Sequence, residues 1–179
     1  MQATELLKHE HRVIELVLAG LERLAGQVEA GQPLDRTLAA KALEIIVNFA
    51  DRCHHGKEEQ HLFTLMAKHG MPTETGPLFV MLHEHEEGRG HVRAMREALA
   101  AAPGEVADAR FAASAHAYAA LLRSHIYKED NVLYPMAERM LNDQDDAQLL
   151  REFDEVERQE MGEGVHEKYP QWAHELAGT

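Results

Sequence analysis

The segment HHGKEEQHLF, residues 54–63, decides the fold because it places polar side chains inside a helical apolar pattern. Apolar residues recur at spacings of three and four through this part of the chain, and His54 and Glu58 occupy two positions of that stripe. The stripe reads Leu43, Val47, Ala50, His54, Glu58, Leu62 and Leu65. On an α-helix, His55 and Glu59 are rotated by about 100° from this stripe. The spacing therefore predicts that His54 and Glu58 face the interior.

A second segment, HIYKEDNVLYP (125–135), repeats the spacing with His125 and Glu129, again one helical turn apart. Both side chains continue an apolar stripe made of Phe111, Ser114, Tyr118, Leu121, Leu122, His125, Glu129 and Val132. One such pair could belong to an exposed polar face. Two pairs, each on an apolar stripe, predict a buried polar layer.

Single histidines lie on two further stripes. His11, in HEHRVI (9–14), continues the spacing of its apolar neighbours, and so does His85, in HEHEEGRGH (83–91). Gly88 follows His85 on the same face, where glycine costs about 1 kcal/mol of helix stability relative to alanine. We expect it to leave room beside His85 in the interior of the bundle.

Composition bounds the class of protein. The chain has 179 residues, 45% hydrophobic but only 6% aromatic, with few β-branched runs, which favours one all-helical domain. The net charge of −13, with no Lys/Arg cluster on any one segment, argues against nucleic acid as a partner. Apolar runs far shorter than about 20 residues argue against a membrane span. The single cysteine, Cys53, and the lack of a signal-peptide pattern predict a cytoplasmic protein.

Helix start and stop signals predict the fold class: an all-α, up-down-up-down four-helix bundle with an additional short C-terminal helix and capping tail. We expect a first helix from Thr4 as N-cap to Gly31, a second from about Asp35 to Gly70, and a third from Pro77 to the APGE break (102–105). A fourth helix would follow that break, and a fifth would span about residues 147–161 and end at Gly162. Tyr169 and Trp172 would anchor the tail. The bundle would occupy residues 1–145, with residues 146–179 packed on the same domain.

The bundle topology brings the polar positions to one depth. Counted at 3.6 residues per turn, two antiparallel hairpins place six residues in one layer near one end of the bundle. These are His11, His54, Glu58, His85, His125 and Glu129. Buried ionised groups without partners cost several kcal/mol each, and metal ions remove that cost. Imidazoles with carboxylates suit first-row transition metals, iron foremost, rather than calcium or magnesium.

These segments resemble the hemerythrin-like family, also called the HHE cation-binding domain, over about residues 5–140. The resemblance implies a four-helix bundle that holds a non-heme di-iron centre, with two iron ions joined by an oxo or hydroxo bridge. It implies that His11, His54, Glu58, His85, His125 and Glu129 are the ligands and that Glu58 and Glu129 bridge the irons. The ligand set also tolerates zinc or a mixed metal content.

One departure from the oxygen-carrying members concerns function. Those proteins have another histidine where this chain has Met81, and a His-x4-Asp spacing where it has His125-x3-Glu129. Octahedral coordination then leaves about two positions open, which favours binding and turnover of dioxygen, peroxide or nitric oxide. A sensor or binder of oxygen or nitric oxide without turnover, and an iron store or donor, use the same ligands. The expected partner is a small gaseous or peroxide ligand, with no protein partner indicated.

The remaining candidates have ordinary interpretations. Met81 and Tyr118 are expected to fill the core. Histidines off the stripes are expected at the surface or as hydrogen-bonding partners: His9, His55, His61, His83, His91 and His116. Glu10, Glu59 and Glu84 fit either hydrogen bonds to histidine or a solvated helix face. A ferritin-like site needs two Glu-x-x-His motifs on bundle helices; Glu58-x-x-His61 and Glu163-x-x-His166 are wrongly placed for it.

Overall fold

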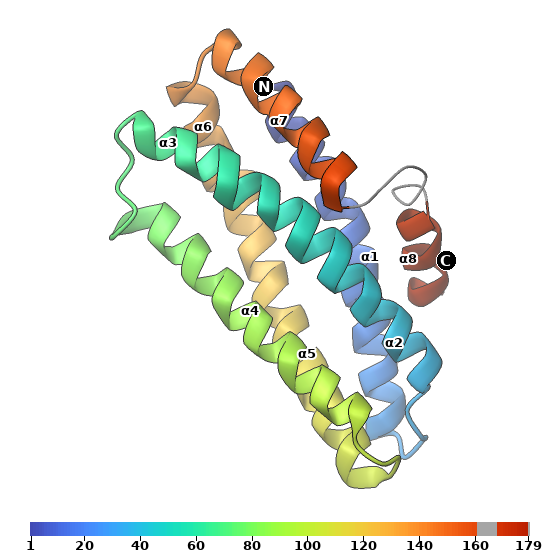
Figure 1. Ribbon diagram of the computed structural model, residues 1–179. Coiled ribbons are helices and arrows are strands. Elements are labelled where there is room, and N and C mark those ends of the chain that lie inside the picture. The colour runs from blue at the N-terminus through green and yellow to red at the C-terminus, as the bar shows by residue number, and fades with distance from the viewer. Residues whose placement is uncertain (161–167, 179) are drawn as a thin grey trace.

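The computed structural model describes residues 1–160 and 168–178, and within these ranges the chain is all-α, without a β-strand. The first half comprises α1 (Gln2–Glu29), α2 (Arg36–Ile45), η1 (Ile46–His55), η2 (Glu58–Leu62) and α3 (Phe63–Lys68). The second half comprises α4 (Gly76–Ala100), α5 (Glu105–Lys128), η3 (Glu129–Leu133), α6 (Tyr134–Met140), α7 (Asp143–Glu160) and α8 (Lys168–Ala177). The predicted antiparallel bundle with an additional C-terminal helix is confirmed, and the expected capping tail contains a further helix, α8 (Figure 1).

The bundle consists of four long rods. The first is α1; the second runs from α2 through η1 and η2 to α3; the third is α4; the fourth runs from α5 through η3 to α6 (Figure 1). The N-terminal ends of α1 and α4 therefore lie level with α6 and α3. This is the alignment that brings the histidine segments of all four rods to one end of the bundle.

Local signals explain most helix ends. The Asp35 carboxylate accepts hydrogen bonds from the backbone N–H of Thr37 and Leu38 and so caps α2. Gly31 and Gly70 have φ values of +83° and +101°, the left-handed conformation that ends a helix. These ends agree with the sequence prediction.

The predicted N-cap of the first helix was wrong. Helix α1 begins at Gln2, before Thr4, because the Asp146 carboxylate of α7 accepts hydrogen bonds from the N–H groups of Gln2 and Ala3, both at 3.0 Å. The Thr4 hydroxyl instead donates to the carbonyl of Met1 at 3.0 Å. A tertiary contact thus supplies the cap that the local sequence lacks.

Three segments of the second and fourth rods are π-helical: η1, η2 and η3. Their i→i+5 hydrogen bonds unwind the rod and rotate the residues that follow relative to an α-helix. The clearest result is at the end of η3, where Val132 is 47% exposed and Leu133 only 1% exposed. The expectation that Val132 lies on the buried stripe was therefore wrong.

Two apolar clusters fill the bundle, one on each side of the polar layer. The larger includes Ile14, Cys53 and Leu122, and the smaller includes Leu7 and Met81. Because Leu7 and Ile14 flank His11 on one helix, the histidine layer lies between the two clusters. Met81 packs in the smaller cluster, as expected of a core residue.

The C-terminal helices cover the first two rods. The buried inner face of α7 carries Leu149, Phe153 and Val156. Helix α7 begins four residues before the expected start, and its expected end, Gly162, lies outside the described residues. Tyr169 is buried and Trp172 packs beside it, so both anchor α8 as expected. The division at residue 145 and the cytoplasmic location stay predictions. No helix in the described part of the chain is long and apolar enough to cross a bilayer.

Candidate metal centre

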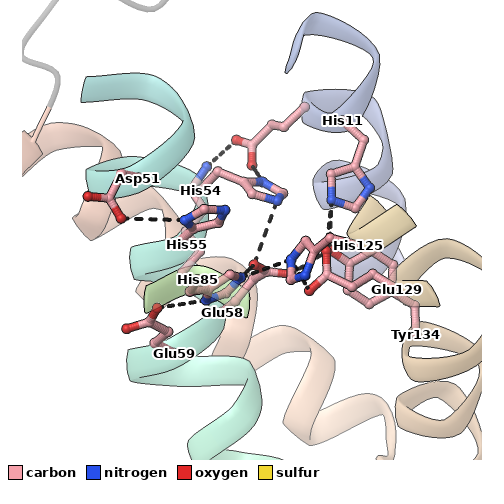
Figure 2. A network of polar contacts seen from close by, with 12 residues as sticks. His11, Asp51, His54, His55, Glu58, Glu59, His85, His125, Glu129 and Tyr134 are labelled. Atoms are coloured by element: carbon pink, nitrogen blue, oxygen red, sulfur yellow. Dashed lines mark hydrogen bonds and ion pairs between the residues drawn. The ribbon is translucent and has the colours of Figure 1, made fainter. Parts of the chain in front are cut away.

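All six residues expected in one layer are buried and lie together (Figure 2). They come from all four rods: His11 from α1, His54 from η1, Glu58 from η2, His85 from α4, His125 from α5 and Glu129 from η3. None is more than 1% exposed. The helices therefore assemble the polar layer that the spacing predicted.

One group of candidate ligands consists of His11, His54, Glu58 and Glu129. One ligand atom from each lies within 4.8 Å of every other, close enough to hold a single metal ion. The Nε2 atom of His11 is 3.2 Å from Oε2 of Glu129, and Nε2 of His54 is 3.7 Å from Oε2 of Glu58. Two imidazoles and two carboxylates thus converge on one point.

A second group consists of His55, Glu58, His85 and His125, with the same 4.8 Å limit. The Nε2 atom of His85 is 3.5 Å from Oε2 of Glu58 and 3.0 Å from Nε2 of His125. Glu58 belongs to both groups. Because they share a carboxylate, the two groups fit two adjacent metal ions.

His55 was missed by sequence reasoning. It is 4% exposed, and its ring stacks on that of His85 with 3.8 Å between centroids. On an α-helix it would point away from His54's stripe, but η1 is π-helical up to His55 itself. The prediction that His55 lies at the surface was therefore wrong, and its role as a metal ligand is taken up below as a proposal. The doubled letters His54–His55 are a signal, yet only the register gives each its direction.

Carboxylates hold every candidate histidine through its other nitrogen. The Nδ1 atoms pair with Asp130 for His11 (2.7 Å), Glu10 for His54 (2.8 Å), Asp51 for His55 (3.4 Å), Glu59 for His85 (2.7 Å) and Glu84 for His125 (2.9 Å). Such pairs fix the tautomer with the proton on Nδ1 and leave Nε2 free for a metal. Glu10, Glu59 and Glu84 are therefore partners rather than a solvated face. Asp51 and Asp130 were not singled out from the sequence.

Each of these carboxylates also forms an ion pair with a lysine or an arginine. Lys57 is fully buried between Glu10 and Glu157, and Arg89 bridges Asp51 and Glu59. Lys128 pairs with Glu84, and Arg12 pairs with Asp130. Burial by itself raises the pKa of Glu10, Asp51, Glu59 and Glu84, but their histidine and cation partners outweigh it and lower each pKa below its usual value. The carboxylates thus stay ionised.

The facing nitrogens test whether the residues fit a metal. Nε2 of His85, on a ring that stays neutral, faces Nε2 of His125 across 3.0 Å, and both nitrogens point into the layer. Oε2 of Glu58 and both carboxylate oxygens of Glu129 are buried without a hydrogen-bond partner in the described part of the chain. Such an arrangement of acceptors is costly alone and is satisfied by cations. The donor set therefore fits bound metal ions.

The histidines and carboxylates of the layer differ in the direction of their pKa shifts. Burial lowers the pKa of His54 to about 4 and that of His85 to about 3, so both rings are neutral at pH 7. Burial also lowers the pKa of His125, but Glu129 and Glu84 outweigh it and raise the pKa to about 9. Burial and the negative charge of Glu129 raise the pKa of Glu58. Metal ions would compete with protons at His125 and Glu58.

Tyr134 was also missed, although it lies in HIYKEDNVLYP. Its hydroxyl donates to Oε1 of Glu58 at 2.6 Å and lies 3.3 Å from Nε2 of His11. Tyr134 follows η3, whose register turns it inward. It holds the shared carboxylate from the side of α6.

Other histidines lie away from this layer. His9 and His83 are exposed, and His61, partly exposed, is 3.1 Å from Oε2 of Glu152 on α7. The pair Glu58 and His61 therefore does not form a ferritin-type motif. The second such pair, Glu163 and His166, lies outside the described residues. Tyr118 is buried in the larger apolar cluster, as expected.

Comparison with known proteins agrees with this geometry. The family described as Hemerythrin HHE cation binding domain matches residues 2–137, which include every candidate ligand from His11 to Glu129. No match was found among curated proteins or among solved structures. Since the match spans most of the chain and all four rods, the chain belongs to the hemerythrin HHE cation-binding domain family.

Proposed function

We propose that this protein holds a di-iron centre and uses it to bind and turn over small oxidants such as dioxygen, peroxide or nitric oxide. The observation that carries the proposal is the pair of ligand groups that share Glu58. The ligands would be the six residues expected from the sequence together with His55. Five imidazoles and two carboxylates suit iron, and they suit other first-row metals such as zinc as well.

The protein's own part is to orient and protect the site. Bound iron would supply redox chemistry and positions for a small ligand. The Nδ1 pairs to carboxylates hold five imidazoles in one tautomer, and Tyr134 holds Glu58 by a hydrogen bond. The two apolar clusters above and below keep bulk water from the layer. These features support an orderly exchange of one small molecule rather than a loose store of metal.

The metal content of variants tests the ligand assignment. We expect two irons per chain and a near-ultraviolet band typical of a bridged diferric centre in the unaltered protein. Glu58→Ala should lose both irons because both groups use Glu58, whereas His54→Ala and His55→Ala should each lose one. His61→Ala, on the same rod but outside the layer, is the matched control. Retention of two irons by Glu58→Ala would refute the assignment.

Turnover is tested separately on the loaded protein. Catalytic consumption of peroxide or nitric oxide, followed with a gas or peroxide electrode, is the expected result. Reversible spectral changes without consumption would indicate a binder or sensor. Transfer of iron to a metal-free acceptor protein would indicate an iron donor. The variant with the lost centre, Glu58→Ala, provides the background rate.

A further inference from the structure

A cavity of about 250 Å³ leads toward the second ligand group. It lies between η1 and α4, and two candidate ligands, His55 and His85, form part of its lining. Gly88, Val92 and Tyr118 also line it. A methyl group at Gly88 would lie 3.5 Å from the ring of Tyr118, in ordinary van der Waals contact, so glycine leaves that space beside the cavity unfilled. The room expected beside Gly88 thus belongs to a cavity that reaches the site.

Arginines surround this cavity. Four of its lining residues are arginines: Arg52 from η1 and Arg89, Arg93 and Arg96 from α4. The only acid in the lining is Asp51, which is already paired with His55 and Arg89. An adjoining depression of about 480 Å³ shares Arg52 and Arg96 and extends the opening along α2.

Three of these arginines form no ion pair within the described part of the chain. Arg89 is committed to Asp51, Glu59 and Glu86. By contrast, Arg52, Arg93 and Arg96 are exposed, and none makes an ion pair with another described residue. Arg52 donates a hydrogen bond to the uncharged side-chain oxygen of Asn48, at 3.4 Å. Three unneutralised guanidinium groups therefore face the opening of a cavity that leads to the candidate metal centre.

This concentration of positive charge is unusual for a chain with a net charge of −13. Arg89, Arg93 and Arg96 recur at spacings of four and three on one face of α4, so the expectation of no Lys/Arg cluster on any one segment was wrong. Arg52 joins them across the interface with η1. A cleft lined by one sign of charge focuses the field and raises the local concentration of oppositely charged ligands. A neutral gas would gain nothing from such charges.

We propose that this cavity admits a small inorganic anion to the second ligand group and that Arg52, Arg93 and Arg96 attract it electrostatically. The inference rests on the proposed metal centre and adds a small inorganic anion to the small oxidants proposed as its ligands. The volume of about 250 Å³ suits an ion of a few heavy atoms. Guanidinium groups are strong donors to oxyanions and similar ions.

The test compares a charged and an uncharged ligand on iron-loaded protein by stopped-flow spectroscopy at pH 7. Azide serves as the small anion and hydrogen peroxide as the uncharged ligand. The variant Arg52→Glu/Arg93→Glu/Arg96→Glu should bind azide at least about tenfold more slowly, because steering changes association rates by 10- to 1,000-fold. Its rate with peroxide should change less than about twofold. Added salt should slow azide binding in the unaltered protein and much less in the variant.

A matched variant controls for net charge. Arg110→Glu/Arg139→Glu/Arg151→Glu changes the same number of exposed arginines outside the cavity and should leave the azide rate nearly unchanged. An azide rate unaffected by the cavity variant, or equal slowing of azide and peroxide, would overturn the inference while the iron content and near-ultraviolet band stay normal. Failure of the unaltered protein to load two irons would instead overturn the proposed function.

Discussion

Adjacent histidines on η1 serve different ligand groups. His54 lies with His11, whereas His55 stacks on His85, and Glu58, one turn later, is shared by both groups. Each imidazole is held by its own carboxylate, so replacing that carboxylate would loosen one ring at a time. The carboxylate paired with each imidazole therefore helps to set the proton affinity of that one candidate ligand.

Metal affinity should depend on pH through His125. A metal binds only the neutral ring, and Glu129 and Glu84 overcome the effect of burial and raise the pKa of His125 to about 9. We expect the apparent affinity for zinc, measured by competition with a chelator, to rise by up to about tenfold per pH unit from pH 7 to pH 9. His54 and His85 contribute nothing in this range because their pKa values are about 4 and 3.

The variant Glu84→Gln isolates this effect. It removes one charge that raises the pKa of His125, so the rise in affinity should level off at a lower pH. An affinity that stays flat between pH 7 and pH 9 in the unaltered protein would contradict the assignment of a protonated His125. Circular dichroism would confirm that the variant is folded.

At the scale of elements, the π-helical segments decide which side chains enter the layer. They are confined to the second and fourth rods, close to Glu58 and Glu129, and they turn His55, Leu133 and Tyr134 inward. π-Helical segments are rare in proteins, and those that occur are often found at functional sites. Here they allow neighbouring residues of one rod to reach both ligand groups.

Two neighbouring substitutions test the register of η3. Leu133→Ala should lower the free energy of unfolding by about 2–5 kcal/mol, the cost of removing a buried leucine side chain. Val132→Ala should change it by less than about 0.5 kcal/mol, because Val132 is largely exposed. Urea unfolding of both variants provides the measurement. If Val132→Ala destabilised the protein more than Leu133→Ala, the result would contradict the π-helical register and support the regular α-helical stripe that includes Val132.

At the scale of the whole molecule, the C-terminal helices bind the bundle by close contacts. Helix α8 approaches α1 so closely at Gly20 that an added Cβ would lie 2.7 Å from Cβ of Leu176. The Arg23 side chain donates hydrogen bonds to the carbonyl of Leu176 at 3.0 and 3.1 Å. On α7, Glu157 pairs with the buried Lys57 behind the layer. The C-terminal helices thus support the ligand-bearing rods.

Two glycines on α1 test this packing. Gly20→Ala should destabilise the protein by about 1–3 kcal/mol in urea unfolding, because the new methyl group displaces α8. Gly26→Ala, on the same helix with nothing within 4 Å, should be neutral or stabilise by up to about 1 kcal/mol through helix propensity. Equal effects of the two substitutions would contradict the close approach of α8.

The sequence by itself determined the all-α bundle, the helix stops at Gly31 and Gly70, and the common depth of His11, His54 and His85. These features depend on periodicity, turn residues and helix length, which are local properties. The same reasoning placed Glu58 and Glu129 in the layer, because residues four positions apart lie on nearly the same face of an α-helix and of a π-helix.

Only the tertiary structure decided which other residues join the site. His55 and Tyr134 enter the layer through π-helical register, which no local pattern announced. Asp51 and Asp130 acquire their roles from the rotation of the rods that carry them, and Arg52 and Arg93 line one cavity although they lie on different rods. The physical reason is that a side chain's periodicity is set along its own helix, whereas its partners are set by how helices rotate and pack against one another.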